Sequence, residues 1–239
     1  MKLKMKNISI FLFSIFYINS SFANITISPV ILEINAKNET RSTSILLENA
    51  EDGVSHIYEV TPYKWTQNQL GEDQLEPASD IVINPRTIQL NKGDQRSVRI
   101  GFRQKLSEMD LKQEQSWRLL FQEIESPLEN TGIGINVNFS IPLFAAEKPN
   151  TTSPNLEAIL DEKTATLKIR NLNAYHIKIM GIDLINKEGA TSESFPQLKY
   201  ILANQEMILN LRKSDADQNI KAQIKIDQID KPLLLPIHK

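Results

Sequence analysis

The chain has 239 residues, of which 23% are charged, with a formal net charge of −2 and no cysteine. At about 100–200 residues per domain, this length allows one or two domains. The lack of cysteine excludes a thiol nucleophile and a cysteine-ligated metal, and the slightly acidic balance argues against nucleic-acid or anionic-membrane binding as the main role.

The first 23 residues have the pattern of a secretory signal peptide. Three lysines within the first six residues precede an apolar stretch at residues 8–18, which is too short to span a bilayer. Residues 21–23, Ser-Phe-Ala, have the small-x-small spacing of a cleavage site, so we predict cleavage after residue 23, with a membrane anchor as the alternative. The mature chain then keeps 24 of the 27 basic side chains against 29 acidic ones, a net charge of −5. A bacterial periplasm fits such a cysteine-free exported protein.

Short strands are predicted from the start of the mature chain. Asn24 to Ile34 looks like a strand but contains Pro29, which lacks the amide hydrogen that a central strand needs. We therefore predict an edge strand that kinks or changes its partner at Pro29. Trp65 is expected to fill the core. Further strands are predicted from period-two alternation and turn signals at residues 42–48, 54–61, 81–84, 88–90, 96–102 and 117–124.

The connecting segments are polar. Gln67 to Asp80 is predicted to be a loop, and Lys105 to Gln115 could hold a helical turn. The proline-bearing segment Glu147 to Pro154 is typical of a linker. After it, strands are predicted at residues 166–170, 175–179, 206–212 and 220–227. The sequence thus predicts an all-β fold with two β-sandwich domains, residues 24–148 and 149–239.

The longest alternating stretch runs from Ile133 to Leu143. Every odd position is apolar and every even one is Gly, Asn, Ser or Pro, which places one apolar stripe on one face of a strand. At about 3.3 Å per residue the stripe is about 36 Å long, longer than a common strand of about 5–6 residues. Pro142 favours a sheet edge or a strand end. The stripe belongs either to an ordinary half-buried strand or to a strand whose apolar side chains are partly available to bind another protein.

No constellation for catalysis or metal binding is found. The histidines His56, His176 and His238 have no metal-ligand neighbour at i+2 or i+4 and are expected to be packed or surface residues. No serine lies in a G-x-S-x-G turn, and no phosphate-binding glycine loop occurs. The sequence therefore favours a protein that is not an enzyme and that uses neither a cofactor nor a metal.

Three motifs taken together resemble a known family. They are ISPVILEI, INPRTIQLNKGDQRSVRI, and the pair WRLLFQEI and GINVNFSIPLFA. Over about residues 24 to 149 their combination resembles the periplasmic chaperones of chaperone–usher pilus assembly. The archaic type looks most similar, because of Trp117-Arg118 and the short loop before Ile133. The second half resembles the family only in size and strand pattern.

The resemblance implies a boomerang of two immunoglobulin-like domains, with the alternating stretch as the last strand of the first domain. Such chaperones lend this strand to a pilus subunit that lacks one, and deliver the subunit to an outer-membrane usher. The acidic net charge argues against a nucleic-acid partner, and no later stretch is long and apolar enough for membrane insertion. A free chaperone could self-associate through its exposed strands. The implied donor-strand residues are Ile133, Ile135, Val137, Phe139 and Ile141, and the implied residues of the neighbouring edge strand are Ile25, Ile27 and Ile31.

The basic residues with which better-known members hold the subunit's C-terminal carboxylate are absent here. Those members use an arginine on the first strand and a lysine on the last, whereas the first strand here has no basic residue and Pro142 occupies the lysine position. Arg118 is our first candidate for a carboxylate anchor and Arg86 our second, because a guanidinium can bind both oxygens. Each could instead be an ordinary surface arginine. The candidates for the family's interdomain salt bridge are Glu123 and, as its partners, Lys148 and Asp227 or Asp230.

Two other functions compete with this one. An exported adhesin or pilus structural subunit would need a free N-terminal extension with alternating apolar residues, whereas strand-like sequence here follows the predicted cleavage site directly. An exported hydrolase would need a convergent cluster of acid, base or metal ligands, which the sequence does not show. We therefore predict a periplasmic chaperone of a Gram-negative bacterium, exported by a cleavable signal peptide.

Overall fold

The computed structural model describes residues 25–38, 41–50, 55–125, 136–150, 153–212 and 221–238. Within them almost all regular structure is β-strand, and the helical segments are two 3-10 helices, η1 (Ala36–Asn38) and η2 (Leu106–Glu108). The prediction of an all-β fold is confirmed. The predicted signal peptide at residues 1–23, together with Ile133 and Ile135, lies outside the described residues.

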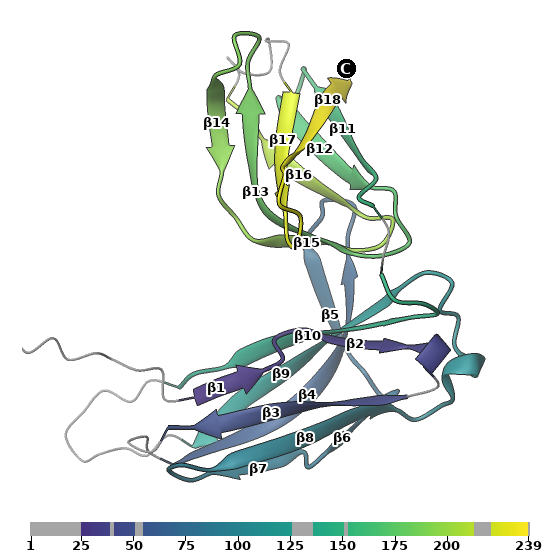
Figure 1. Ribbon diagram of the computed structural model, residues 1–239, viewed down its shortest axis with the longest axis vertical. Coiled ribbons are helices and arrows are strands. Elements are labelled where there is room, and N and C mark those ends of the chain that lie inside the picture. The colour runs from purple at the N-terminus through teal and green to yellow at the C-terminus, as the bar shows by residue number, and fades with distance from the viewer. Residues whose placement is uncertain are drawn as a thin grey trace, which may run out of the picture.

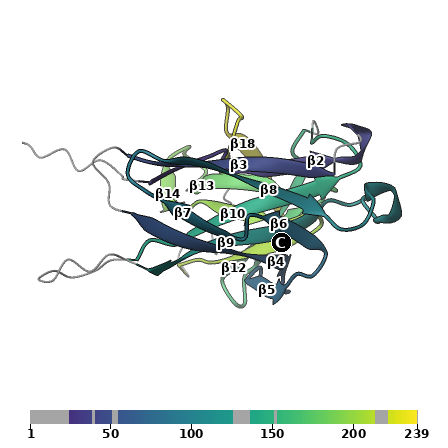
Figure 2. The same cartoon turned by 90° about the horizontal axis from the view of Figure 1, so that it is seen from below.

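The N-terminal half of the chain forms two sheets that enclose one core (Figure 1). One sheet has the strand order β1-β3-β8-β6, and the other has the order β2-β10-β9-β4-β5 with β7 paired to β4. Figure 2 shows these strands running along the length of the domain. Their bounds are β1 (Ile25–Ser28), β2 (Leu32–Asn35), β3 (Ser42–Asn49), β4 (His56–Gln67), β5 (Asp73–Pro77), β6 (Ile81–Asn84), β7 (Thr87–Leu90), β8 (Gln95–Phe102), β9 (Gln115–Glu125) and β10 (Phe139–Ala146).

The chain changes sheet at Pro29, as the sequence predicts. β1 pairs antiparallel with β3 in one sheet, whereas β2 pairs in parallel with β10 in the other. Pro29 lies between the two strands, where no ladder hydrogen bond is required of it. Because β1 has crossed to the other sheet, it does not pair with the first residues of β10.

Alternate apolar side chains from both sheets fill the space between them. Leu47, Val60 and Leu119 are fully buried, and the rings of Phe102 and Trp117 pack edge to face with their centroids 4.9 Å apart. Burying one such large side chain stabilises a fold by about 1.5–3 kcal/mol. The period-two pattern in the sequence predicts these strands because the apolar residue at every second position is the one that is buried in this core.

The C-terminal half forms one eight-stranded sheet that encloses a second core. Its strand order is β14-β13-β17-β18-β11-β12-β16, with β15 paired to β13. The last strand of the first half ends at Ala146 and the first strand of the second begins at Leu156, and the predicted boundary between residues 148 and 149 stays a prediction. The strand bounds are β11 (Leu156–Asp161), β12 (Thr166–Asn171), β13 (Ile177–Ile185), β14 (Thr191–Phe195), β15 (Lys199–Ile201), β16 (Glu206–Asn210), β17 (Lys221–Ile226) and β18 (Leu233–His238).

Several elements differ from the sequence-based prediction, and β11, β14, β15 and β18 form where no strand was predicted. The predicted loop from Gln67 to Asp80 contains β5, which pairs with the second half of β4. Every residue of β5 is exposed, so no buried apolar face marks it in the sequence. The strand predicted at Ile133 to Leu143 begins, within the described residues, only at Phe139.

The two domains meet at a third apolar cluster, which gives the molecule its boomerang shape (Figure 1). Trp65 and Phe144 of the N-terminal domain pack against Tyr200 and Leu202 of the C-terminal domain. Trp65, expected in a domain core, therefore lies at the domain junction. The side chain of Gln67 donates to the carbonyl of Tyr200 at 2.8 Å and accepts from the amide of Leu202 at 3.0 Å.

A histidine and a glycine complete the domain junction. His176 stacks on Phe144 with ring centroids 3.6 Å apart, and its Nδ1 and backbone amide both lie 2.8 Å from one carboxylate oxygen of Glu114. Gly71 has a φ of +71° and lies so close to the backbone of Met207 that an added Cβ would approach the Met207 Cα to 2.8 Å. These contacts fix the two domains at one angle.

Candidate binding site

An unpaired sheet edge lies beside the connection from β1 to β2. β10 pairs with β9 over Phe139–Ala145, but it pairs with β2 only from Leu143 onward. In the part of the chain that the structure describes, Phe139–Pro142 therefore has no strand on that side. β1 is an edge as well, because it pairs with β3 alone. Backbone groups along such edges can pair with an added strand.

The apolar side chains of β10 become more buried along the strand. Val137, just before the strand, is 46% exposed, whereas Ile141 and Leu143 are 7% and 0% exposed. Phe139 is half-buried, and its ring lies 5.8 Å from that of Tyr58. Ile141 belongs to the core of its own domain, so we expect it to hold the strand in place rather than to fill a partner's groove. Val137 and Phe139 keep accessible surface at the edge.

The three residues predicted to cover the neighbouring edge lie in two places. Ile25 and Ile27 are half-buried on β1 and pack against the core of the N-terminal domain. Ile31 lies between β1 and β2 and packs against the interdomain cluster. The assignment of Ile31 to the edge strand is therefore wrong, because the chain has already left β1 at Pro29.

A buried carboxylate holds the residues that precede β10. The side chain of Glu123 is fully buried, and its Oε1 lies 2.7 Å from Nδ1 of His56. Its Oε2 accepts a hydrogen bond of 2.8 Å from the backbone amide of Val137, and the Glu123 amide donates to Oδ1 of Asn138 at 3.0 Å. These bonds attach Val137 and Asn138 to β9 and fix where β10 begins.

The predicted interdomain salt bridge is wrong. Glu123 pairs with His56 of its own domain, and Asp227 pairs with Lys178 of its own domain at 3.0 Å. Lys148 is exposed, and within the described residues no ion pair reaches it. The described junction is instead held by the apolar cluster and by the hydrogen bonds of Gln67 and His176. Pairing acidic residues with lysines in the sequence does not predict these contacts.

Arg118 lies at the domain junction, between aromatic rings from both domains. Its guanidinium carbon is 3.7 Å from the ring centroid of Trp65 and 5.4 Å from that of Tyr200. In the sheet, Arg118 is opposite Pro142 of β10 on one side and Tyr63 of β4 on the other. Stacking on aromatic faces restricts a guanidinium and stabilises its charge.

The Arg118 guanidinium forms neither a hydrogen bond nor an ion pair with any residue that the structure describes. Burial lowers the pKa of Arg118, and the nearby Asp73 carboxylate opposes this effect. A guanidinium stays protonated in proteins, so Arg118 carries a half-buried positive charge with available N–H donors. Its planar fork matches a carboxylate, which can accept two parallel hydrogen bonds.

Arg86 lies at a different place. It is exposed between β6 and β7, and its backbone carbonyl accepts from the amide of Val60 at 2.9 Å. Its side chain borders a pocket with Ile81 and Arg103, and no aromatic ring among the described residues stacks on its guanidinium. The structure therefore does not bring Arg86 and Arg118 into one site, and only Arg118 is oriented by its surroundings.

Two acid–histidine pairs escape the sequence analysis. His56 and Glu123 are separated by 67 positions, and His176 and Glu114 by 62. No local spacing predicts such pairs, because strands that are distant in the sequence bring the partners together.

In the described part of the chain, no group of three or more histidine, aspartate and glutamate side chains is placed to hold a metal ion. None of the helical segments described has the length and apolar character to cross a membrane. The groups that the described site offers are an open backbone edge, accessible apolar side chains and a half-buried guanidinium.

The fold is that of the two-domain β-sandwich chaperones of pilus assembly. A chain of the chaperone–tip adhesion subunit complex CsuC–CsuE, from archaic chaperone–usher pili of Acinetobacter baumannii, matches with a TM-score of 0.66 and 20% identity, covering 91% of this chain and 99% of that one. The Salmonella enterica SafA pilin–SafB chaperone complex matches with a TM-score of 0.62 and 12% identity, with coverages of 91% and 98%. The E. coli chaperone DraB matches with a TM-score of 0.61 and 11% identity, with coverages of 89% and 96%.

The sequence itself shows the family. Residues 24–152 match the profile of the pili and flagellar-assembly chaperones, PapD N-terminal domain, and the chain belongs to this family. No curated protein sequence matches the chain. The predicted resemblance to chaperones of the chaperone–usher pathway is thereby confirmed.

Proposed function

We propose that the protein is a periplasmic chaperone that captures pilus subunits by donor-strand complementation and delivers them to an outer-membrane usher. The observation that carries the proposal is the open edge of β10 with its accessible apolar side chains. Family membership supports it, as do the solved relatives, which include complexes of a chaperone with a tip adhesion subunit and with a pilin. The predicted signal peptide supports a periplasmic location.

The physical basis of capture is the need to cover an incomplete sandwich. A subunit that lacks a strand exposes an apolar groove and unpaired backbone groups, and both promote aggregation. Val137 and Phe139 can enter the groove, and burying each is worth about 1.5–3 kcal/mol. Each backbone hydrogen bond along the edge adds about 0.5–1.5 kcal/mol. The predicted donor residues Ile133 and Ile135 would extend the stripe, and Ile25 and Ile27 would cover the neighbouring edge.

Arg118 is the proposed anchor for the C-terminal carboxylate of the subunit. Its guanidinium is half-buried and stacked on Trp65, and among the described residues it forms neither a hydrogen bond nor an ion pair. It lies on β9 opposite Pro142, with β10 between it and the open edge, so the C-terminal residues of a captured strand would reach it by passing over Pro142. Hydrogen bonds to charged groups contribute about 1.5–3 kcal/mol. Because this energy is gained only when the chain end lies at Arg118, the anchor would also set the register of the captured strand.

A pull-down from the native periplasm tests this proposal. The baits are the wild type, Val137→Asp and the control Val82→Asp, in which an equally small apolar residue on β6 of the same domain is 41% exposed. We expect the wild type and Val82→Asp to retain a small exported β-protein in a one-to-one complex. Val137→Asp should lose it while keeping its circular dichroism spectrum, because a carboxylate cannot enter an apolar groove without a partner.

Equal capture by Val137→Asp and the wild type would refute the donor-strand proposal. If no bait retains such a protein, the chaperone proposal itself fails. The same pull-down with Arg118→Ala and Arg86→Ala distinguishes the two anchor candidates. We expect Arg118→Ala to weaken capture, and a loss with Arg86→Ala alone would assign the anchor to Arg86.

A further inference from the structure

A second cation faces the domain junction from the opposite domain, next to Tyr200. Tyr200 of β15 lies across the junction, with its ring centroid 5.4 Å from the Arg118 guanidinium carbon. In the ladder between β13 and β15, Lys178 is the residue directly opposite Tyr200. Directly opposed residues of an antiparallel pair share one face of the sheet. Lys178 is therefore on the face of β13 that meets the N-terminal domain.

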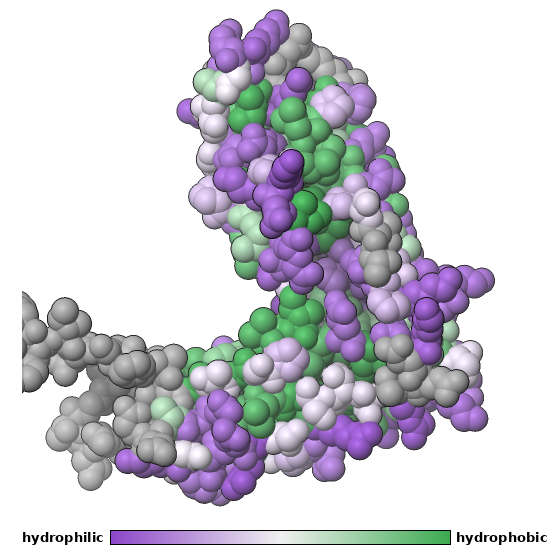
Figure 3. Space-filling view, viewed as in Figure 1, coloured by the Kyte–Doolittle hydropathy of each residue, from purple (hydrophilic) through white to green (hydrophobic). Residues whose placement is uncertain are grey.

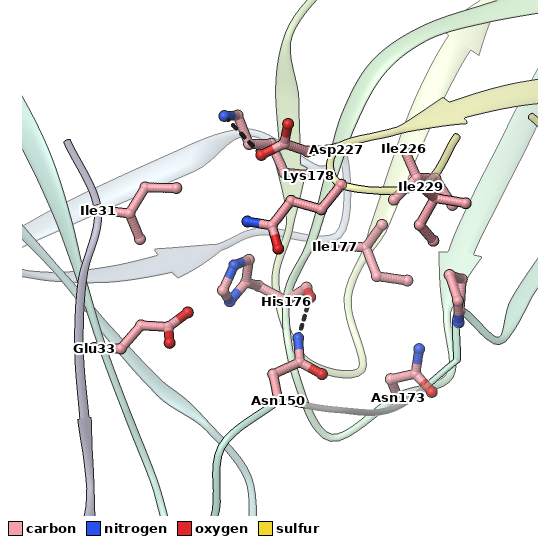
Figure 4. Close-up of a pocket in the computed structure, with 12 residues that line it drawn as sticks. Ile31, Glu33, Asn150, Asn173, His176, Ile177, Lys178, Ile226, Asp227 and Ile229 are labelled. Atoms are coloured by element: carbon pink, nitrogen blue, oxygen red, sulfur yellow. Dashed lines mark hydrogen bonds and ion pairs between the residues drawn. The ribbon is translucent and has the colours of Figure 1, made fainter. Parts of the chain in front are cut away.

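Lys178 lines a pocket between the two domains (Figure 4). Ile31 and Glu33 form the N-terminal wall, and His176, Lys178 and Asp227 lie on the C-terminal wall. The Lys178 side chain is only 18% exposed, and its Nζ lies 3.0 Å from Oδ2 of Asp227. The ammonium is thus held at the pocket by one acid, whose own side chain is more exposed. Figure 3 shows apolar surface gathering where the domains meet, around this junction.

Tyr200 lies within reach of both cations. Burial raises the pKa of Tyr200, and the positive charges of Lys178 and Arg118 both act against this rise, whereas Asp227 adds to it. The geometry agrees, because the Arg118 guanidinium faces the Tyr200 ring and Lys178 is the cross-strand neighbour of Tyr200. A carboxylate at this junction would meet one guanidinium from β9 and one ammonium from β13.

The N-terminal domain offers no second cation near Arg118 from the strands that border the open edge. β1, β2 and β10 contain neither lysine nor arginine, and Pro142 occupies the position opposite Arg118. A second positive charge for the carboxylate would come from another element, and Lys178 is a half-buried lysine of the facing domain that lines the interdomain pocket.

We infer that Lys178 is the second cation of the carboxylate site, so that this site is shared between the two domains. The inference rests on the proposed function, in which Arg118 holds the C-terminal carboxylate of a captured subunit. Asp227 is the resident counter-ion of Lys178, and the incoming carboxylate takes over part or all of that role.

The test compares two synthetic peptides of alternating valine and threonine, one with a free C-terminal carboxylate and one with a C-terminal amide. Their affinities for the full mature protein are measured by calorimetry, and the ratio of the two affinities reports the contribution of the carboxylate. We expect Lys178→Gln to lower this ratio about tenfold, as loss of one charged hydrogen bond would. Lys178→Arg should keep most of it, and Asp227→Asn should raise it, because the competing acid is gone.

Lys225→Gln is the matched control, since Lys225 pairs with Asp183 at 2.9 Å in the same domain and does not line the pocket. Its affinity ratio should equal that of the wild type. If Arg118→Gln lowers the ratio and Lys178→Gln does not, the inference is overturned and the proposed function stands. If the wild type binds both peptides equally, or binds neither, the proposed anchoring by Arg118 fails, and the inference fails with it.

Discussion

Replacing His56 by alanine should loosen the start of β10 while leaving the sandwich folded. The Glu123 side chain is 0% exposed, and it has two partners among the described residues, the imidazole of His56 and the amide of Val137. Removing the imidazole leaves one carboxylate oxygen buried without a donor. Hydrogen bonds to charged groups are worth about 1.5–3 kcal/mol, so we expect the free energy of unfolding to fall by that amount.

Urea unfolding followed by tryptophan fluorescence measures this loss, with His238→Ala as the control, because His238 is exposed at the end of β18. Amide hydrogen exchange gives the local readout, in which Val137 should exchange faster in His56→Ala than in the wild type. Glu123→Gln combined with His56→Ala should lose less stability than the sum of the two single changes, since both remove one interaction. A loss below about 0.5 kcal/mol, within the usual range of surface substitutions, with unchanged exchange at Val137 would refute the reasoning.

Two further predictions concern Lys64 and Gly71. Burial lowers the pKa of Lys64 from 10.5 to about 8, so the unfolded chain binds this proton more tightly. The contribution of Lys64 to stability should therefore rise with pH from about 8 to 10.5, and the difference in unfolding free energy between Lys64→Met and the wild type should shrink over that window. Gly71→Ala should destabilise the protein by more than about 1 kcal/mol in thermal unfolding, because a Cβ there meets the Met207 backbone at a φ of +71°. An unchanged melting temperature would contradict the tight approach of the two domains.

Strand positions were predictable from the sequence where one face of the strand is buried. Val98 and Ile100 alternate with polar residues on β8, so a period of two is visible. β5 carries no such signal, because all its residues are exposed and it is defined by its pairing with β4. The change of sheet at Pro29 was predictable for another reason, since a proline cannot donate to a continuous ladder.

The candidate site was predictable only in part. The stripe leading to Leu143 indicated a special strand, but periodicity cannot show that Ile141 lies in the domain's own core while Val137 is accessible. Arg118 was found through the missing lysine at Pro142. Lys178 gave no signal, because its relation to Arg118 depends on the angle between two domains rather than on any spacing along the chain.

The interdomain cluster has a consequence for how the chain reaches its native state. Domains generally fold as units, so the N-terminal sandwich can form before its neighbour has docked. At that stage Trp65 and Phe144, now covered by Tyr200 and Leu202, would face water beside the open edge of β10. The half-assembled protein would thus resemble the aggregation-prone clients it is proposed to protect. Docking of its own second domain is the step that ends this vulnerability.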